Sequence, residues 1–182
     1  GNSMLNPAVF LDRDGVLCRT FVRNGKSYAP RELKNFILMP NSHHLVNLLQ
    51  RAGFKVIVVT NQPDIGNGFV ALSIVESMHK KLFNKTKIDD VFLCPHRQDE
   101  GCNCRKPNPG MLLAAAEKHK IDLGKSYMVG DRASDVVAGQ RAGCKSIFID
   151  RQYAESRPLN PEVTVKSLQK AVSYILTNKL ML

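Results

Sequence analysis

The sequence predicts an α/β fold, a three-layer, Rossmann-like arrangement in which helices cover both faces of a parallel sheet. Short apolar runs rich in β-branched residues alternate with longer segments of helical periodicity, a pattern typical of βαβ units. Polar and acidic residues follow directly after several of these runs. Open α/β sheets bind ligands at the carboxyl ends of their strands, so the same pattern predicts a ligand site at that edge.

Each expected strand is a short apolar run bounded by polar residues, as strands buried on both faces are. Residues 56–59 and 146–149 show this most clearly. The irregular segment 19–36 is expected to form a flap over the site, and Pro158 and Pro161 indicate a loop before the last helix. The strands are expected at 7–11, 55–60, 90–93, 126–130 and 145–149. The helices are expected at 41–52, 71–84, 109–119, 133–142 and 166–178.

The chain has 182 residues, enough for one domain with a sizeable core, and residues 1–182 are expected to form a single domain. The apolar and charged fractions, 43% and 23%, are ordinary for a globular protein. Residues 1–3, which precede Met4, are typical of an expression-tag remnant. The sequence shows no signal peptide and no apolar stretch near about 18 residues. This favours a cytoplasmic protein with reduced thiols.

Asp12 and Asp14 end the first apolar run, and Gly15 permits a tight turn just after them. Residues two apart in a strand point to the same side, so both carboxylates are expected to meet at one spot. Two carboxylates that close favour a bound cation, and Mg²⁺ suits both oxygen ligands and a phosphate substrate. An acidic strand-to-loop turn is the alternative for this motif alone.

Two further clusters carry groups that bind phosphate. The hydroxyl and amides of Thr60, Asn61 and Gln62 follow one strand and can donate hydrogen bonds to a phosphoryl oxygen. Lys106 can neutralise a transferring phosphoryl group, and Arg105 can grip a second anion. Taken alone, the first cluster favours a polar strand-to-loop turn and the second a solvated basic pair. Because parallel strands end at one edge, their convergence favours a site for phosphoryl transfer.

Another strand runs into the acidic loop that holds Asp131 and Asp135. Asp131 is a candidate to complete the metal site, and Asp135 to cap or orient a neighbour. The whole set resembles the haloacid dehalogenase superfamily of phosphotransferases over roughly residues 8–150. The residues that carry the resemblance to its four motifs are, in order, Asp12 with Asp14, Thr60, Lys106, and Gly130-Asp131-Arg132 with Asp135.

The resemblance implies a mechanism. Asp12 would attack phosphorus to form an aspartyl-phosphate, and Asp14 would protonate the leaving oxygen and then activate water. Mg²⁺ would be held by Asp12, the backbone carbonyl of Asp14, and Asp131. Thr60 and Lys106 would bind the phosphoryl group in the transition state.

Three cysteines and a histidine form the pattern Cys-x-His-x5-Cys-x-Cys within eleven positions. Thiolate and imidazole ligands in this spacing suit tetrahedral Zn²⁺, whereas a disulfide is disfavoured in the cytoplasm. With all four positions filled by protein, the zinc is expected to be structural and to hold the loop that leads into Lys106. Cys18 and Cys144 are left over and are assigned to packing. The four ligands are Cys94, His96, Cys102 and Cys104.

A zinc loop in this position resembles one branch of the superfamily, the heptose bisphosphate phosphatases and their histidinol-phosphate phosphatase relatives, which lack a large cap domain. The stretch 102–112 carries this resemblance, and it implies that Arg105, together with Asn61 and Gln62, binds the substrate. The implied substrate is D-glycero-D-manno-heptose 1,7-bisphosphate. Histidinol phosphate or another small sugar phosphate is the alternative, because residues 63–64 and Asn67 depart from the branch's usual Ser-Gly and Arg.

The net charge of +10, from 26 basic and 16 acidic residues, favours an anionic partner. Since the basic residues are scattered and Trp is absent, no nucleic-acid groove is indicated. We expect a monomer that acts on a small phosphorylated molecule without a membrane or nucleic-acid partner. Two interpretations from other classes stay open, a 3′-phosphatase that acts on nucleic-acid ends and a catalytically silent, zinc-stapled binding module.

Overall fold

A computed structural model describes residues 4–180, so the tag remnant expected at residues 1–3 lies outside the described part. The chain folds around a six-stranded sheet in the order β5-β4-β1-β6-β7-β8, in which every pairing is parallel. This confirms the expected α/β class. The strands are β1 (Ala8–Leu11), β4 (Lys55–Asn61), β5 (Asp90–Cys94), β6 (Tyr127–Gly130), β7 (Lys145–Ile149) and β8 (Val163–Val165).

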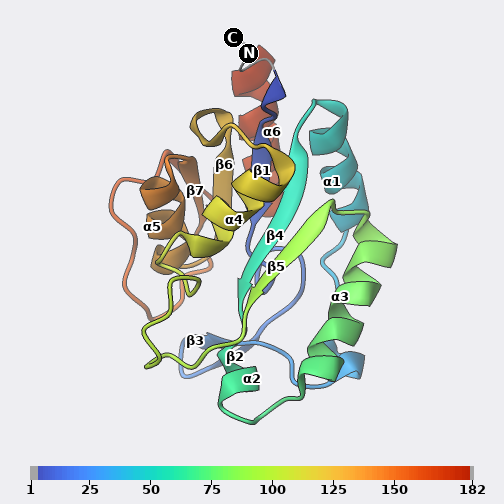
Figure 1. Ribbon diagram of the computed structural model, residues 1–182, viewed down its shortest axis with the longest axis vertical. Helices are drawn as coiled ribbons and strands as arrows, with labels where there is room; N and C mark the ends of the chain where they lie inside the picture. The colour runs from blue at the N-terminus through green and yellow to red at the C-terminus, as the bar shows by residue number, and fades with distance from the viewer. Residues whose placement is uncertain (1–3, 181–182) are drawn as a thin grey trace.

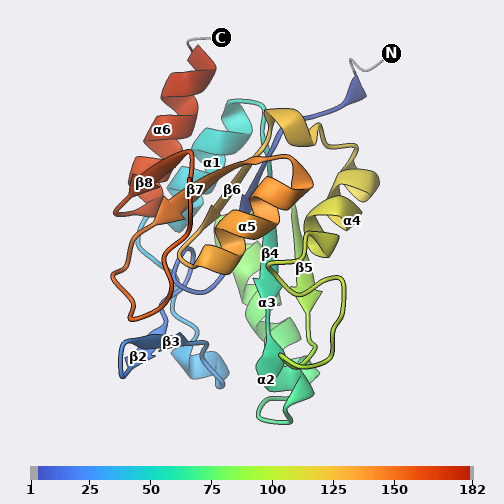
Figure 2. The ribbon, with the colours of Figure 1, turned by 90° about the vertical axis from the view of Figure 1, so that its left-hand side faces the viewer.

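Helices cover both faces of the sheet, as expected (Figures 1 and 2). Side chains alternate along β1, so that Val9 and Leu11 join a core with α1, α3 and α6, while Ala8 and Phe10 join a second core with α4 and α5. All four of these side chains are fully buried, which explains why the strand is apolar throughout. The helices are α1 (Ser42–Arg51), α3 (Leu72–Thr86), α4 (Gly110–His119), α5 (Ala133–Ala142) and α6 (Leu168–Leu180).

The sequence pattern missed one strand of the sheet. Strand β8 pairs with β7 in parallel, with Ile147 beside Val163, in a stretch expected to be loop. This three-residue edge strand has an exposed residue between two half-buried ones, too short a run for the apolar pattern to reveal. The helices α3 and α6 also begin and end one or two residues later than expected. None of the helices within residues 4–180 combines the length and the apolarity that crossing a membrane requires.

Segment 19–36, the flap, contains a small antiparallel hairpin, β2 (Phe21–Arg23) and β3 (Lys26–Tyr28), and a 3-10 turn at Leu33–Asn35. Figures 1 and 2 show this hairpin and the short helix α2 (Pro63–Gly66) at the end of the molecule toward which β1 and β4 point, and Figure 2 shows the two on different sides of that end. The carboxyl ends of the strands therefore open toward the flap and α2. The functional side chains predicted from sequence gather at this end.

Candidate active site

Asp12 follows β1 directly and lies in the middle of the carboxyl edge of the sheet. Its carboxylate is buried, and Oδ1 accepts a hydrogen bond of 2.8 Å from Lys106 Nζ. The chain turns sharply at Gly15, whose φ is +82°, and a Cβ there would lie 1.9 Å from Asp131 Oδ2. A residue without a side chain is thus required for the turn to bring β1 and β6 residues together.

Three buried carboxylates, from Asp12, Asp131 and Asp135, have oxygen atoms within 4.8 Å of one another. Burial and the charge of Asp135 raise the pKa of Asp12 from 3.8 to about 6 in spite of the neighbouring Lys106. Burial and the other two charges raise the pKa of Asp131 well above its ordinary value. Asp131 Oδ1 is buried and has no hydrogen-bond partner. The group therefore carries more negative charge than its protein surroundings balance.

Lys106 is the cation that the described structure sets against this group. Its Nζ donates to Asp12 at 2.8 Å, to Asp135 at 2.7 Å and to the carbonyl of Val59 at 2.8 Å. Burial alone would lower the pKa of Lys106, but the two carboxylate charges outweigh it and raise the pKa. The side chain of Asn61 holds the backbone of Lys106 through bonds to its N–H and carbonyl, at 3.0 and 3.1 Å. Asn61 thus positions the lysine, in addition to lining the cavity.

Asp14 lines the same cavity as Asp12 but is not part of the carboxylate group. Its carboxylate accepts hydrogen bonds from Arg13 at 2.9 Å, from Gln62 Nε2 at 2.8 Å and from the Cys18 thiol at 3.1 Å. Burial would raise the pKa of Asp14, but the Arg13 charge and these bonds lower it. Strand β1 ends at residue 11, so the alternation does not extend to Asp14, although both carboxylates line the same cavity.

The remaining predicted residues also lie at this edge. Thr60 is fully buried at the end of β4, and its hydroxyl accepts a bond of 2.8 Å from Gln62 Nε2. Arg105 lines the cavity, and its Nη1 is buried without a hydrogen-bond partner. Cys144 is buried, as expected for a packing residue, whereas Cys18 is buried and also bonds Asp14.

A cavity of about 670 Å³ contains the site. Ser27 and Arg31 of the flap line it, and so do residues that follow β4 and β6. The flap thus covers the site, as the sequence predicted. The lining residues with cationic side chains are Arg31, Arg105, Lys106 and Arg132.

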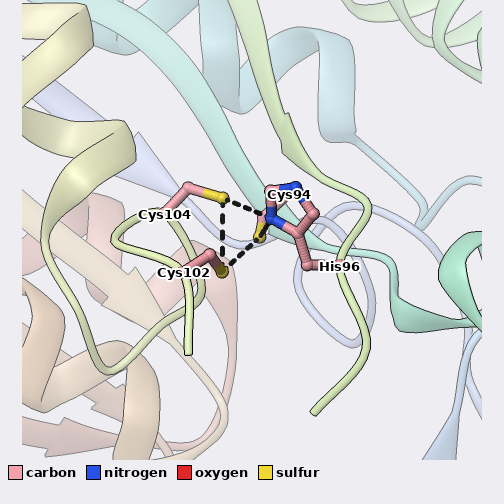
Figure 3. A group of neighbouring side chains, drawn as sticks. All are labelled: Cys94, His96, Cys102 and Cys104. Carbon is pink, nitrogen blue, oxygen red and sulfur yellow. Dashed lines mark hydrogen bonds between the residues drawn. The ribbon is translucent and has the colours of Figure 1, made fainter. Parts of the chain in front are cut away.

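The four predicted zinc ligands form a second group, at the end of β5 and in the loop that follows it (Figure 3). Cys94 Sγ and Cys104 Sγ each lie 3.6 Å from Cys102 Sγ, and His96 Nδ1 lies 3.5 and 3.3 Å from the same two sulfurs. A tetrahedral Zn²⁺ with bonds of about 2.3 Å to sulfur needs edges near 3.8 Å, so these donors have suitable spacing. All five cysteines are free thiols.

Comparisons with known proteins place the chain among phosphatases. A family model described as HAD-hydrolase-like matches residues 103–171. The D-glycero-beta-D-manno-heptose-1,7-bisphosphate 7-phosphatase of Helicobacter pylori strain J99 is 31% identical over 93% of this chain and 97% of its own. The enzyme of the same name from Vibrio cholerae is 36% identical over 97% of this chain and all of its own. The chain belongs to the HAD-like phosphatases.

Solved structures of HAD-like proteins have the same fold. The D,D-heptose 1,7-bisphosphate phosphatase of B. bronchiseptica, crystallised with magnesium and phosphate, has a TM-score of 0.82 and 26% identity over 94% of this chain and 99% of its own. A HAD-like phosphatase from Mesorhizobium loti has a TM-score of 0.76 and 26% identity over 96% of this chain. The resemblance inferred from the motifs is therefore confirmed, and the chain is a hydrolase of phosphoric monoesters rather than a silent binding module.

Some residues of this HAD-like site had no role assigned from sequence. Arg13, between the two aspartates, is completely buried, with its guanidinium 5.2 Å from the Phe36 ring centroid and 3.1 Å from His79 Nε2. Burial, followed by the charge of Arg13, lowers the pKa of His79 from 6.5 to about 4, so the imidazole is neutral at pH 7. Neutral His79 and Phe36 leave Asp14 as the anionic partner of Arg13.

The loop after β7 supplies two further contacts. Tyr153 donates from its hydroxyl to Asp131 Oδ2 at 2.8 Å, and Arg151 donates to the carbonyl of Gly15 at 2.9 Å. The signal available in the sequence was the position of residues 150–153 directly after a strand, at the same edge as the motifs. Nothing in the residue types themselves distinguished that loop from an ordinary polar one.

Proposed function

We propose that this protein removes one phosphate from D-glycero-D-manno-heptose 1,7-bisphosphate in a Mg²⁺-dependent reaction, as a single domain. The observation that carries the proposal is the buried Asp12 beside Lys106, in a cavity that Arg105 and Arg132 also line. Relatives between 31% and 37% identical, which this chain matches over most of their length, bear the name of that enzyme. A cavity of about 670 Å³ is large enough for a whole sugar phosphate.

The residues present fit a hard divalent cation. Three buried carboxylates within 4.8 Å of one another offer oxygen ligands, and the orphaned Asp131 Oδ1 lacks any other partner. Asp12, Asp131 and the backbone carbonyl of Asp14 would hold Mg²⁺, with Asp135 close by. When bound, the cation would neutralise charge on the nucleophile and on the phosphoryl oxygens.

The side chains then divide the reaction between them. Asp12 attacks phosphorus and displaces the sugar oxygen, which gives an aspartyl-phosphate. Asp14, held by Arg13 and Gln62, is ionised in the free protein, so it must first take up a proton as the anionic substrate enters. It then donates this proton to the departing oxygen and later takes one from the attacking water. Thr60 and Lys106 bind the phosphoryl oxygens, and their charge and hydrogen bonds act mainly in the transition state.

The group of Cys94, His96, Cys102 and Cys104 would bind a structural zinc ion. The loop it closes leads directly into Arg105 and Lys106, so the ion would fix the cations of the catalytic site. Hydrogen bonds across the loop support this role, from Gly110 N to the carbonyl of Asn103 at 3.1 Å and from Asn108 Nδ2 to the carbonyl of Cys102 at 2.9 Å.

The test is a comparison of phosphate release, with and without Mg²⁺, from heptose 1,7-bisphosphate, histidinol phosphate and a 3′-phosphorylated DNA end. We expect the highest kcat/KM with the heptose bisphosphate and no turnover when the metal is chelated. Asp131→Ala should raise the Mg²⁺ concentration needed for half-maximal rate. A clear preference for histidinol phosphate or DNA ends would contradict the substrate assignment, and turnover without Mg²⁺ would contradict the metal assignment.

A further inference from the structure

The cavity extends well beyond the carboxylate group. Besides Asp12, its lining includes a second region made by the flap and by the segment after β4. In that second region lie Arg31, Asp64 and Phe69. A substrate whose phosphate reaches Asp12 would meet this region with its other end.

Arg31 and Asp64 form an ion pair that joins the flap to α2. Arg31 Nε donates to Asp64 Oδ2 at 3.1 Å and Nη2 donates to Oδ1 at 3.4 Å. The side chains are 50% and 22% exposed, and the guanidinium carbon lies 4.5 Å from the centroid of the Phe69 ring. Ion pairs with such long N–O distances and exposed side chains contribute little to stability, so a phosphate can replace Asp64 as the partner of the arginine.

The two sides of the ion pair differ in how they are held. Gly66 N donates to the carbonyl of Pro95 at 3.0 Å, within the loop of the cysteine–histidine group, and Phe69 N donates to the carbonyl of Asp64 at 2.9 Å. A Cβ at Gly66 would come within 2.7 Å of that Pro95 oxygen, so α2 is seated closely on the loop. On the flap, all three residues of β2 are exposed, and a hydrogen bond of 2.8 Å from Ala154 N to the carbonyl of Gly25 joins the hairpin to the loop after β7 rather than to α2. Asp64 therefore belongs to the fixed side, and Arg31 is carried by the flap.

We infer that Arg31 binds the anionic group of the substrate that is not hydrolysed, and that Asp64 is its counter-ion in the free enzyme. The ion pair thereby sets the preference for substrates with two anionic groups. The inference rests on the proposed function in one respect, that the other phosphate reacts at Asp12.

The competing explanation is that the pair only fastens the flap to α2. The two explanations predict opposite results for Asp64. If the pair is a fastener, removing either partner loosens the flap and lowers activity on every substrate. If Asp64 competes with the substrate for Arg31, removing its charge strengthens binding of a second phosphate, whereas removing Arg31 weakens it.

The experiment measures the ratio of kcat/KM for heptose 1,7-bisphosphate to that for heptose 7-phosphate, two substrates with the same reacting phosphate. Arg31→Ala should lower this ratio by about 10- to 100-fold, the range for a hydrogen bond to a charged group. Asp64→Asn should raise it about 2- to 5-fold, the range for an exposed ion pair. That increase should vanish in the Arg31→Ala background, because Asp64 acts through the arginine.

Lys34→Ala is the matched control. Lys34 lies on the same segment, its side chain is 76% exposed, and it is absent from the cavity lining, so the ratio should stay unchanged. Equal losses on both substrates in Arg31→Ala and Asp64→Asn would overturn the inference in favour of the fastener.

The inference can fail independently of the proposed function. If the wild-type protein hydrolyses neither heptose phosphate, the proposed function is wrong, and calorimetry then tests the inference alone. The probes are fructose 1,6-bisphosphate and fructose 6-phosphate, titrated into Asp12→Asn protein with and without the Arg31 and Asp64 changes. The measured quantity is the ratio of the affinity for the bisphosphate to that for the monophosphate. A ratio that falls with Arg31→Ala and rises with Asp64→Asn supports the role of Arg31, whereas a ratio unchanged by both overturns it.

Discussion

Replacement of Lys106 by Met would remove the one protein cation that touches the carboxylate group in the described structure. The side chain is 3% exposed, and its Nζ bonds Asp12 and Asp135 at 2.8 and 2.7 Å. Met has a similar length and no charge, so the change leaves three buried carboxylates without that partner. Breaking a buried ion pair on one side costs about 3–5 kcal/mol of the free energy of unfolding.

The size of this loss should depend on pH. The folded pKa of Asp12 already lies near 6 with the lysine present, and removal of Lys106 raises it further. A carboxyl whose folded pKa exceeds its unfolded value of about 3.9 loses stability as pH rises through the folded pKa. Without Mg²⁺, the free energy of unfolding of Lys106→Met should therefore lie only slightly below that of the wild-type protein near pH 5. Near pH 8 it should lie below it by the full amount. Added Mg²⁺ should reduce the deficit at pH 8 by binding the folded state.

Urea titrations at pH 5 and 8, each with and without Mg²⁺, measure this effect. Lys118→Met is the control, since its ion pair with Asp90 is also 2.7 Å long but the lysine is 62% exposed, and such pairs contribute about 0–1 kcal/mol. The phosphatase rate of Lys106→Met should fall by about 10²–10³-fold. A deficit that is equal at both pH values and insensitive to Mg²⁺ would refute the electrostatic account of this group.

The other predictions concern the nucleophile, the zinc group and a buried histidine. Asp12→Asn should abolish phosphate release, because an amide cannot form the acyl-phosphate, and Asp14→Asn should slow it by about 10²–10⁴-fold; substantial turnover by Asp12→Asn would rule out the covalent route. Cys102→Ser should purify without zinc and lose about 10²-fold in rate, whereas Cys144→Ser should keep both. Metal analysis and kinetics on the two variants decide this, and full zinc content in Cys102→Ser would contradict the ligand set. His79→Gln should flatten the stability profile between pH 6.5 and 4, because the pKa of His79 falls from 6.5 to about 4 on folding. The unfolded chain then binds the extra proton, and the wild-type protein loses up to about 3 kcal/mol as pH falls through this window. Identical pH slopes of the unfolding free energy in the two proteins would refute this assignment.

The fold could be predicted because its determinants are local. Strands buried on both faces are apolar where they are buried, so β1 and the central residues of β4 and β7 each form a short apolar run. Strand β8 was not predicted, because an edge strand of three residues needs no such apolar run. The cysteine–histidine group could be predicted for the same reason, since its four ligands lie within one short loop.

Contacts between distant segments could not be read from local patterns. The turn of Asp14 toward Arg13 depends on where β1 ends, and the alternation rule carries no information beyond the last residue of the strand. The hydrogen bond from Tyr153 to Asp131 joins residues 22 positions apart. The pair of Arg31 and Asp64 spans 33 positions. Such pairs become visible only after the sheet has brought its strand ends together.

The loop of the cysteine–histidine group connects the two ends of the site. On one side it continues into Lys106, whose Nζ bonds Asp12 and Asp135. On the other side it bonds α2 through Pro95 and Gly66, and α2 carries Asp64. One structural ion would therefore fix both the cation that contacts the reacting phosphate and the counter-ion of Arg31. Such an arrangement would let the domain hold a two-ended substrate, because short segments tied to one loop would hold both of its ends.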